Sequence, residues 1–165
     1  MSGETEAARR RFGLLSDTHG LLRPEALRAL TGVEHVVHAG DVGSPEVLEA
    51  LRARFVLTVV RGNVDRGPWA EVLPLTDTVE LSGTLVHVLH DLQELDLDPR
   101  AAGIQVVVSG HTHRPQIRRE GGVLYVNPGS CGPRRFDLPV TVALLHVGRD
   151  GVDAELVPLL ESGHR

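Results

Sequence analysis

The sequence contains no lysine, and all 17 of its basic residues are arginine. This absence excludes a lysine nucleophile or Schiff base, and it leaves arginine side chains and backbone N–H groups to contact any phosphate. Cys131 is the only cysteine, so an intrachain disulfide is impossible and a reducing, cytoplasmic location is the simplest expectation. No stretch approaches the roughly 18 consecutive apolar residues of a membrane span, so we expect no membrane partner.

The sequence also lacks a long basic segment, and its formal net charge is -5. Proteins that bind nucleic acid mainly through phosphate contacts carry basic surfaces, so we expect no stable nucleic-acid partner. A length of 165 residues with 41% hydrophobic content fits one globular domain. We expect that domain to cover residues 11–160, between a flexible N-terminus (1–10) and a tail (161–165). No segment marks an interface, so the sequence is compatible with both a monomer and a homo-oligomer.

Hydrophobic patterning predicts an α/β fold. Short apolar runs indicate strands at residues 12–15, 33–39 and 55–60. Helices are expected between them, one from Pro24 through Leu30 and one over residues 45–52 with Ser44 as N-cap. This order is typical of parallel strands joined by right-handed crossovers.

The second half of the chain is predicted to be rich in strands. We expect them at residues 77–81, 84–89, 106–109, 117–120, 123–126, 140–147 and 152–158, with one helical turn at 98–102. Glycine-containing hairpin turns are expected at 82–83, 121–122 and 149–151. Two sheets packed face to face, with helices outside, would bury both halves.

Side chains of the kind that bind divalent metals follow directly after many of these apolar runs. The set comprises Asp17, His19, Asp41, Asn63, His90, His111 and His113. In open α/β sheets ligands gather beyond the carboxyl ends of strands, so these residues are expected to meet at one edge. Glycine precedes Asp41, Asn63 and His111, which allows the backbone to approach an ion without a Cβ clash.

The donor set predicts two metal ions. Two carboxylates, four imidazoles and one carboxamide are too many for one tetrahedral zinc, and they suit two ions of higher coordination that share a carboxylate. Two divalent ions, two carboxylates and a bridging hydroxide leave a charge of about +1, which attracts an anionic phosphoester. In two-metal hydrolysis the bridging hydroxide attacks phosphorus in line, so no serine or cysteine nucleophile is required.

The ordered motifs resemble those of the calcineurin-like metallophosphoesterases, specifically their small single-domain prokaryotic phosphodiesterase branch. They are Asp17-x-His19, Gly40-Asp41, Gly62-Asn63, His90, Gly110-His111-x-His113 and Asn127-Pro128-Gly129-Ser130. The resemblance implies a four-layer α/β/β/α sandwich with two divalent ions, manganese favoured and nickel, iron, cobalt or zinc as alternatives. It implies that Asp17, His19 and His113 hold the first ion, that Asn63, His90 and His111 hold the second, and that Asp41 bridges them.

The chain departs from the family pattern at two positions. Many members place a histidine directly after the asparagine, where it protonates the leaving group, but this chain has Val64. The proton must then come from metal-bound water, from Asp65 if that residue is held protonated, or from no group at all, which would favour esters with good leaving groups. Asp65 is also a candidate for contacting the substrate. The second departure is Asp91 after His90, where glycine is common.

Three further residues are candidates for supporting roles. Arg66 and Arg114 are placed to contact a substrate phosphate. His38 lies three residues before Asp41 and is a candidate to support that ligand loop, although a hydrogen-bonded core histidine is the simpler interpretation.

The sequence therefore predicts a metal-dependent phosphodiesterase that acts on a small phosphoester. Two alternatives stay open. One is a phosphomonoesterase acting on a nucleotide or a phosphoprotein, and the other is a non-catalytic scaffold of the same fold that binds a protein, as a retromer subunit does.

Overall fold

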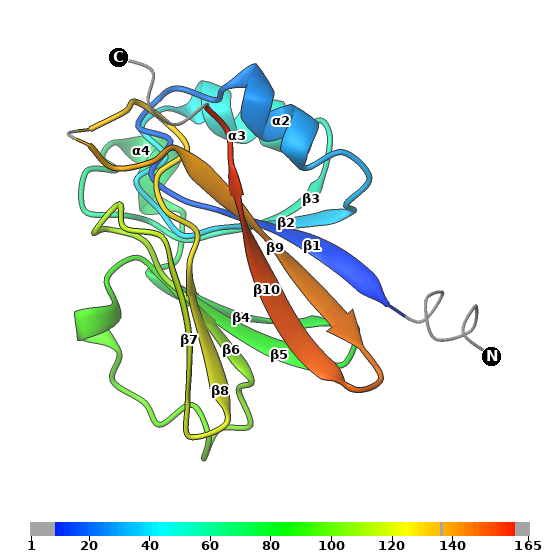
Figure 1. The fold of residues 1–165 in the computed structure, drawn as a ribbon. Helices are drawn as coiled ribbons and strands as arrows, with labels where there is room; N and C mark the ends of the chain where they lie inside the picture. The colour runs from blue at the N-terminus through cyan, green and yellow to red at the C-terminus, as the bar shows by residue number, and fades with distance from the viewer. Residues whose placement is uncertain (1–8, 136, 161–165) are drawn as a thin grey trace.

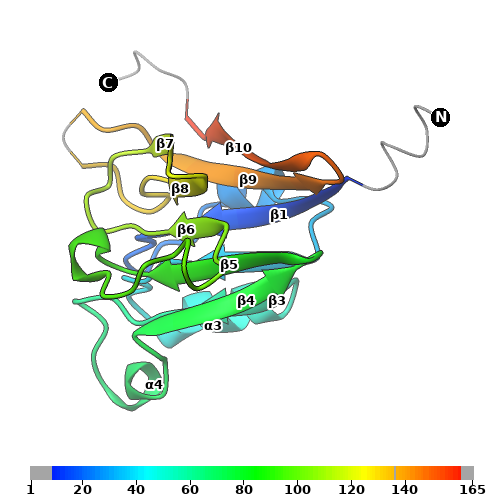
Figure 2. The same cartoon turned by 90° about the horizontal axis from the view of Figure 1, so that it is seen from below.

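The computed structural model of the protein describes residues 9–135 and 137–160. Two five-stranded mixed sheets pack face to face (Figures 1 and 2). The first sheet has the order β10-β9-β1-β2-β3, with β1 (Arg10–Leu15), β2 (His35–His38), β3 (Val56–Val59), β9 (Thr141–Gly148) and β10 (Gly151–Pro158). The second has the order β4-β5-β6-β8-β7, with β4 (Thr76–Leu81), β5 (Thr84–Leu89), β6 (Val106–Val108), β7 (Gln116–Glu120) and β8 (Val123–Asn127). The predicted fold class, an α/β sandwich of two mixed sheets, is confirmed.

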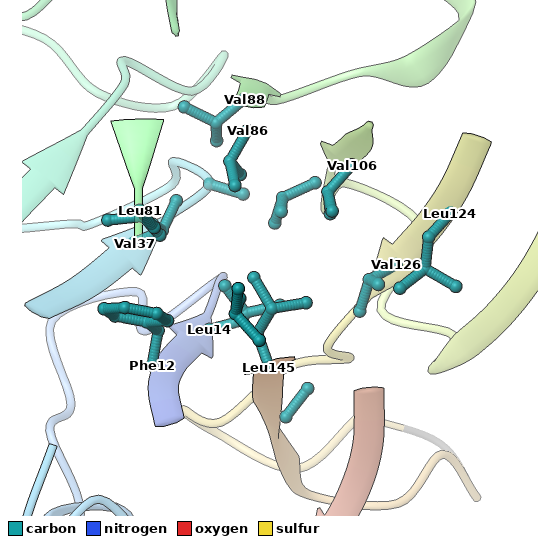
Figure 3. Packing of buried hydrophobic residues seen from close by; sticks show 14 of the residues in the cluster. Phe12, Leu14, Val37, Leu81, Val86, Val88, Val106, Leu124, Val126 and Leu145 are labelled. Atoms are coloured by element: carbon teal, nitrogen blue, oxygen red, sulfur yellow. The ribbon is translucent and has the colours of Figure 1, made fainter. Parts of the chain in front are cut away.

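The main core lies between the two sheets (Figure 3). Alternate residues of each strand face it: Phe12 and Leu14 from β1 meet Val86 and Val88 from β5. The intervening Leu15 faces the opposite side, where it packs under the helices. Both faces of β1 are therefore buried, which explains why its sequence is a continuous apolar run without polar alternation.

The α-helices of the described residues pack against the first sheet. The helices α2 (Pro24–Ala29) and α3 (Pro45–Arg52) pack on its outer face, as Figure 1 shows, and each begins with proline, as predicted. Ser44 is the N-cap residue of α3, but its side chain makes no capping hydrogen bond. The outer face of the second sheet is instead covered by residues 91–104, which bury a smaller cluster around Leu89, Ile104, Val107 and Val123. The fourth layer is thus mostly loop.

Two short elements were not predicted: α4 (Pro68–Glu71) and the 3-10 helix η1 (Leu92–Glu94). Neither is long enough to show a helical period in the sequence. The turn expected at 98–102 is present as one hydrogen bond from Ala102 N to Asp98 O, 3.1 Å long. Of the predicted ends, residues 1–8 and 161–165 lie outside the described residues, and Arg10 already belongs to β1. No helix in the described ranges is long and apolar enough to cross a membrane.

Parallel pairing places the candidate ligands. Strands β1, β2 and β3 are parallel, and so are β5, β6 and β8 in the other sheet. Their carboxyl ends meet at one edge of the sandwich, where Asp17 N donates to Gly40 O at 3.0 Å and Gly110 N donates to His90 O at 2.9 Å. The loops that carry the predicted ligands therefore contact one another.

Candidate metal centre

The backbone at this edge is held in conformations that L-residues rarely adopt. Six non-glycine residues in the described ranges have positive φ, and five are candidate ligands: Asp17 (58°), His19 (46°), Asp41 (58°), His111 (73°) and His113 (63°). The sixth is Ser82, in a hairpin turn. Such conformations cost about 1–3 kcal/mol each and persist where the surroundings enforce them, commonly at functional sites.

The two carboxylate oxygens of Asp17 have different surroundings: Oδ2 accepts hydrogen bonds, and Oδ1 faces imidazole rings. Its Oδ2 accepts hydrogen bonds from Ser16 Oγ at 2.6 Å and from His111 N at 3.2 Å. Its Oδ1 lies 3.4 Å from His113 Nε2 and 3.6 Å from His19 Nε2. The carboxylate is fully buried, so Oδ1 faces these imidazoles and not solvent.

Asp41 repeats the arrangement. Its Oδ1 accepts the backbone N–H of Val64 at 3.0 Å. Its Oδ2 lies 3.2 Å from His90 Nε2 and 3.6 Å from His19 Nε2. This oxygen therefore lies between one histidine of each predicted ligand group, which is where a bridging ligand is needed.

The histidine rings form two pairs. The rings of His19 and His113 are 5.2 Å apart, and so are those of His90 and His111. His90 Nδ1 donates to Ala39 O at 2.8 Å, which leaves the lone pair on Nε2 facing Asp41. His111 Nδ1 lies 3.2 Å from Asn63 Oδ1 at the more exposed rim. All seven predicted ligands are thus brought together.

Four buried polar atoms in the described residues lack a hydrogen-bond partner, and all four belong to predicted ligands: Asp17 Oδ1, His19 Nε2, His90 Nε2 and His113 Nδ1. Buried polar atoms are normally satisfied, and leaving one unsatisfied costs about 1–3 kcal/mol. Two groups have donor atoms within 4.8 Å of one another: Asp17, His19 and His113, and Asp17, Asp41 and His90. The donor chemistry and the unsatisfied atoms fit divalent cations.

Protonation of the cluster points to the same conclusion. Burial alone would raise the pKa of Asp17, but the imidazoles of His113 and His19 close to its carboxylate and the hydrogen bond from Ser16 outweigh burial and lower that pKa. Burial would also raise the pKa of Asp41. The imidazole of His90 beside the carboxylate and the hydrogen bond from the Val64 N–H outweigh burial and lower that pKa. Although burial lowers the pKa of His90, the two carboxylates raise it overall. The carboxylates are therefore held ionised, and the cluster favours a positive charge between them.

Three glycines allow the ligand loops to approach one another. A Cβ on Gly62 would lie 2.1 Å from Asp41 Oδ1, and one on Gly110 would lie 1.9 Å from Ser16 Oγ and 2.6 Å from Asp17 Oδ2. A Cβ on Gly40 would lie 2.9 Å from Gly62 N. These glycines are required for the close approach of adjacent ligand loops, and the close approach to an ion that was predicted for them stays a prediction.

His38 contacts the backbone of two ligand loops. Gly40 N donates to His38 Nδ1 at 3.0 Å, so the ring proton is on Nε2, which donates to Thr18 Oγ1 at 3.0 Å. The Thr18 hydroxyl then donates to Val42 O at 2.7 Å. Burial lowers the pKa of His38 to about 4, which keeps the ring neutral. This chain of bonds ties the Asp17 loop to the Asp41 loop.

Asp65 requires a correction. It was expected to contact substrate or to donate a proton, but its side chain is buried and accepts three backbone N–H groups. The donors are Val42 at 3.2 Å, Gly43 at 2.9 Å and Gly62 at 2.8 Å. A carboxylate used in this way joins the loop of Asp41 to the loop of Asn63, and we assign it to holding that geometry.

The sequence interpretation missed other residues that hold the loops. Asn127 Nδ2 donates to Gly110 O at 3.0 Å and to Thr112 Oγ1 at 3.1 Å, and Ser130 Oγ donates to Asp17 O at 3.0 Å. Both belong to the Asn-Pro-Gly-Ser motif, which was the available signal. Ser16 carried no signal beyond its position next to Asp17.

The arginines near the site differ in placement. Arg66 and Arg114 are exposed, and their predicted phosphate contacts stay predictions. Arg61 instead lines a cavity of about 400 Å³ together with Asn63, His90 and His111. Arg61 is therefore an additional candidate for contacting an anion.

Several other polar or aromatic side chains lie outside the site. His35, His87 and His146 bond to Thr58, Thr78 and Glu155, respectively. Cys131 is buried, and burial raises the pKa of its thiol to about 12, as expected for a packed, unreactive side chain. Trp69 packs against the core under the helices.

Two packed mixed sheets with a cluster of aspartate, histidine and asparagine at their strand ends are the architecture of a metal-dependent phosphoesterase domain. The family model for the calcineurin-like phosphoesterase superfamily domain matches residues 11–150, and the chain belongs to this superfamily.

Known relatives agree with this assignment. The chain is 34% identical over 158 residues to a probable metallophosphoesterase of Methanothermobacter thermautotrophicus, covering 88% of this chain and 91% of that protein. It is 29% identical to a phosphodiesterase of Methanocaldococcus jannaschii, covering 73% of this chain and 84% of the relative. Vacuolar protein sorting 29 from Cryptosporidium parvum shares the fold, with a TM-score of 0.73, 21% identity, and coverage of 93% of this chain and 99% of that one.

Proposed function

We propose that this metallophosphoesterase is a phosphodiesterase that uses two divalent ions, with manganese favoured and nickel, iron, cobalt or zinc as alternatives. The observation that carries the proposal is the group of four buried polar atoms without a hydrogen-bond partner. All four belong to predicted metal ligands. Asp17, His19 and His113 would hold one ion, Asn63, His90 and His111 the other, and Asp41 both. When bound, the ions supply an acidified water as the nucleophile and neutralise charge on the phosphoryl group.

The protein's own residues fix the geometry of this chemistry. Ser16 and Val64 each hold one oxygen of a ligand carboxylate, so the other oxygen has a single direction. Asp65 fixes the distance between two ligand loops. Orientation of this kind raises metal affinity and limits the motion of a bound phosphoester.

The position after Asn63 supports a diester with a good leaving group. Val64 contributes its backbone N–H to Asp41, and its side chain is 45% exposed beside the site without a transferable proton. Asp65 is turned away into its three backbone bonds. A phosphomonoesterase is the alternative, and the curated relative named as a phosphodiesterase favours the diester.

A non-catalytic scaffold is the third possibility, because vacuolar protein sorting 29 has the same fold. That likeness concerns the fold alone. The complete set of seven ligand-type residues supports catalysis in this chain. For the protein in the cell we propose a cytoplasmic location, based on the single buried cysteine, and a small phosphoester as substrate.

The test uses protein reconstituted with Mn²⁺ and two substrates, bis-p-nitrophenyl phosphate and p-nitrophenyl phosphate. We expect faster release of nitrophenol from the diester. His113→Ala and Asn63→Ala should each lower that rate by more than roughly 100-fold, since loss of a ligand exceeds the effect of losing its outer support. His146→Ala is the matched control and should keep the rate. A faster reaction with the monoester supports the alternative enzyme, and no hydrolysis of either ester supports the scaffold.

A further inference from the structure

A second cavity shares His111 with the cavity that Arg61 lines. It has a volume of about 310 Å³ and lies between η1 and the strands β7 and β8. Besides His111, its lining includes Gln93, Gln116, Arg118, Tyr125 and Asn127. This volume is at the lower end of the range for small-molecule sites, roughly 300–1,000 Å³, so the cavity suits one compact group.

The far end of this cavity carries a fixed guanidinium plane. Arg118 and Tyr125 face each other across β7 and β8, and Arg118 Cζ lies 4.3 Å from the centre of the Tyr125 ring. Arg118 Nη1 also lies 3.2 Å from Glu120 Oε1. Tyr125, the only tyrosine of the chain, packs against the buried cluster outside the second sheet. The ring and the carboxylate therefore hold the guanidinium before any ligand arrives.

The near end of the cavity is joined to the metal centre. Asn127 pairs with Gln116 across the two strands, and its amide bonds to the carbonyl of Gly110, directly before His111. Alternate strand residues face the same side, so Arg118 and Tyr125 lie two residues further along, roughly 7 Å away. The cavity is lined by both His111 and Arg118, so a group attached to a phosphate at His111 can extend towards the guanidinium.

We propose that this cavity binds the nucleoside of a nucleotide diester whose phosphate lies at the metal centre. The base stacks on the guanidinium plane of Arg118, a surface that nucleic-acid-binding proteins use for unpaired bases. The side-chain amides of Gln93 and Gln116 offer both donors and acceptors to the edge of the base or to the sugar. This inference rests on the proposed phosphodiesterase function and names its substrate class.

The cavity on the Arg61 side does not offer this chemistry. Asp91 lines both cavities, but the one beside Arg61 is lined in addition by Glu94 and Asp96 and by no aromatic side chain other than histidine. The chain also carries a net charge of -5, which suits a mononucleotide or dinucleotide better than a long polyanion.

The test compares two esters with the same leaving group, thymidine 5′-p-nitrophenyl phosphate and methyl p-nitrophenyl phosphate. We expect the wild type to have a kcat/KM about tenfold higher for the thymidine ester, the size of a single base-stacking contribution. Arg118→Ala should bring the ratio of the two values to about one. Arg118→Lys should do the same, because lysine keeps the charge but lacks the plane. Tyr125→Phe should keep the ratio, and so should the control Arg28→Ala, an exposed arginine on α2.

Three outcomes overturn the inference while leaving the phosphodiesterase intact: a wild-type ratio of about one, a high ratio that survives in both Arg118 variants, or full rescue by lysine. If neither ester is hydrolysed, the proposed function fails, and calorimetry with thymidine 5′-monophosphate and inorganic phosphate decides the subsite. Tighter binding of the nucleotide that is lost in Arg118→Ala supports it, and equal affinities overturn it.

Discussion

Asp65→Asn distinguishes a structural carboxylate from a substrate-binding one. The substitution keeps the shape of the side chain but removes its charge and one acceptor. Val42 and Gly62 donate to Oδ2, and Gly43 donates to Oδ1. If the remaining oxygen keeps the first two bonds, the new NH2 group faces the N–H of Gly43, and two donors oppose each other.

The expected loss of stability follows from these bonds. Hydrogen bonds to a charged group contribute about 1.5–3 kcal/mol, neutral ones about 0.5–1.5 kcal/mol, and an unsatisfied buried donor costs about 1–3 kcal/mol. Two weakened bonds and one lost bond give a destabilisation of about 3–5 kcal/mol. For a domain of this size that lowers the Tm by about 10 °C.

The assay is urea unfolding in EDTA together with a Mn²⁺ titration. Asp65→Asn should lower both the free energy of unfolding and the metal affinity, the latter by roughly 10–100-fold, because the loops of Asp41 and Asn63 lose their connection. Asp77→Asn is the control, since Asp77 is exposed and bonds only its neighbour's N–H among the contacts described, so its effect should stay below about 0.5 kcal/mol. The reasoning would be refuted if stability and metal affinity were unchanged while KM rose or one limb of the pH-rate profile were lost. Asp65 would then contact the substrate.

Three further predictions concern the loops and the ions. Gly110→Ala places a Cβ 1.9 Å from Ser16 Oγ, and should cost about 1–3 kcal/mol and weaken Mn²⁺ binding. An unchanged Mn²⁺ affinity in calorimetry would show that the loop adapts. Because the pKa of His38 is lowered to about 4 in the folded protein, its unfolded form binds a proton first as the pH falls. Stability is therefore full above pH 6.5 and declines by about 3 kcal/mol towards pH 4. Urea unfolding in EDTA should show this decline, and His38→Gln should reduce it; parallel pH profiles would contradict the assignment. Removal of metal should lower the Tm by about 5–10 °C, the effect of a ligand present at about 100 times its Kd, and an equal Tm with and without EDTA would argue against a bound ion.

The fold could be predicted to a large extent because its parallel strands are buried on both faces. Such strands read as short apolar runs, and β1 and β2 follow this rule closely. The layer outside the second sheet could not be predicted in the same way. Residues 91–104 cover it with irregular backbone, and such a segment has no period for the sequence to show.

The candidate site, like the fold, could be predicted from the sequence only in part. Metal-ligand chemistry is a property of residue type and strand-end position, so Asp17, Asp41 and the histidines could be selected from the sequence alone. The role of Asp65 depends on donors more than 20 residues away in the chain, which only the folded backbone brings near. Asn127 and Gly110 are 17 residues apart and likewise come together only in the folded chain.

The central claim is that the strand-end cluster binds two ions. Metal content after reconstitution with Mn²⁺ and gel filtration, measured by plasma mass spectrometry against protein concentration, tests it most directly. The account predicts two ions per chain for the wild type. One ion per chain, or no retained metal, would contradict it.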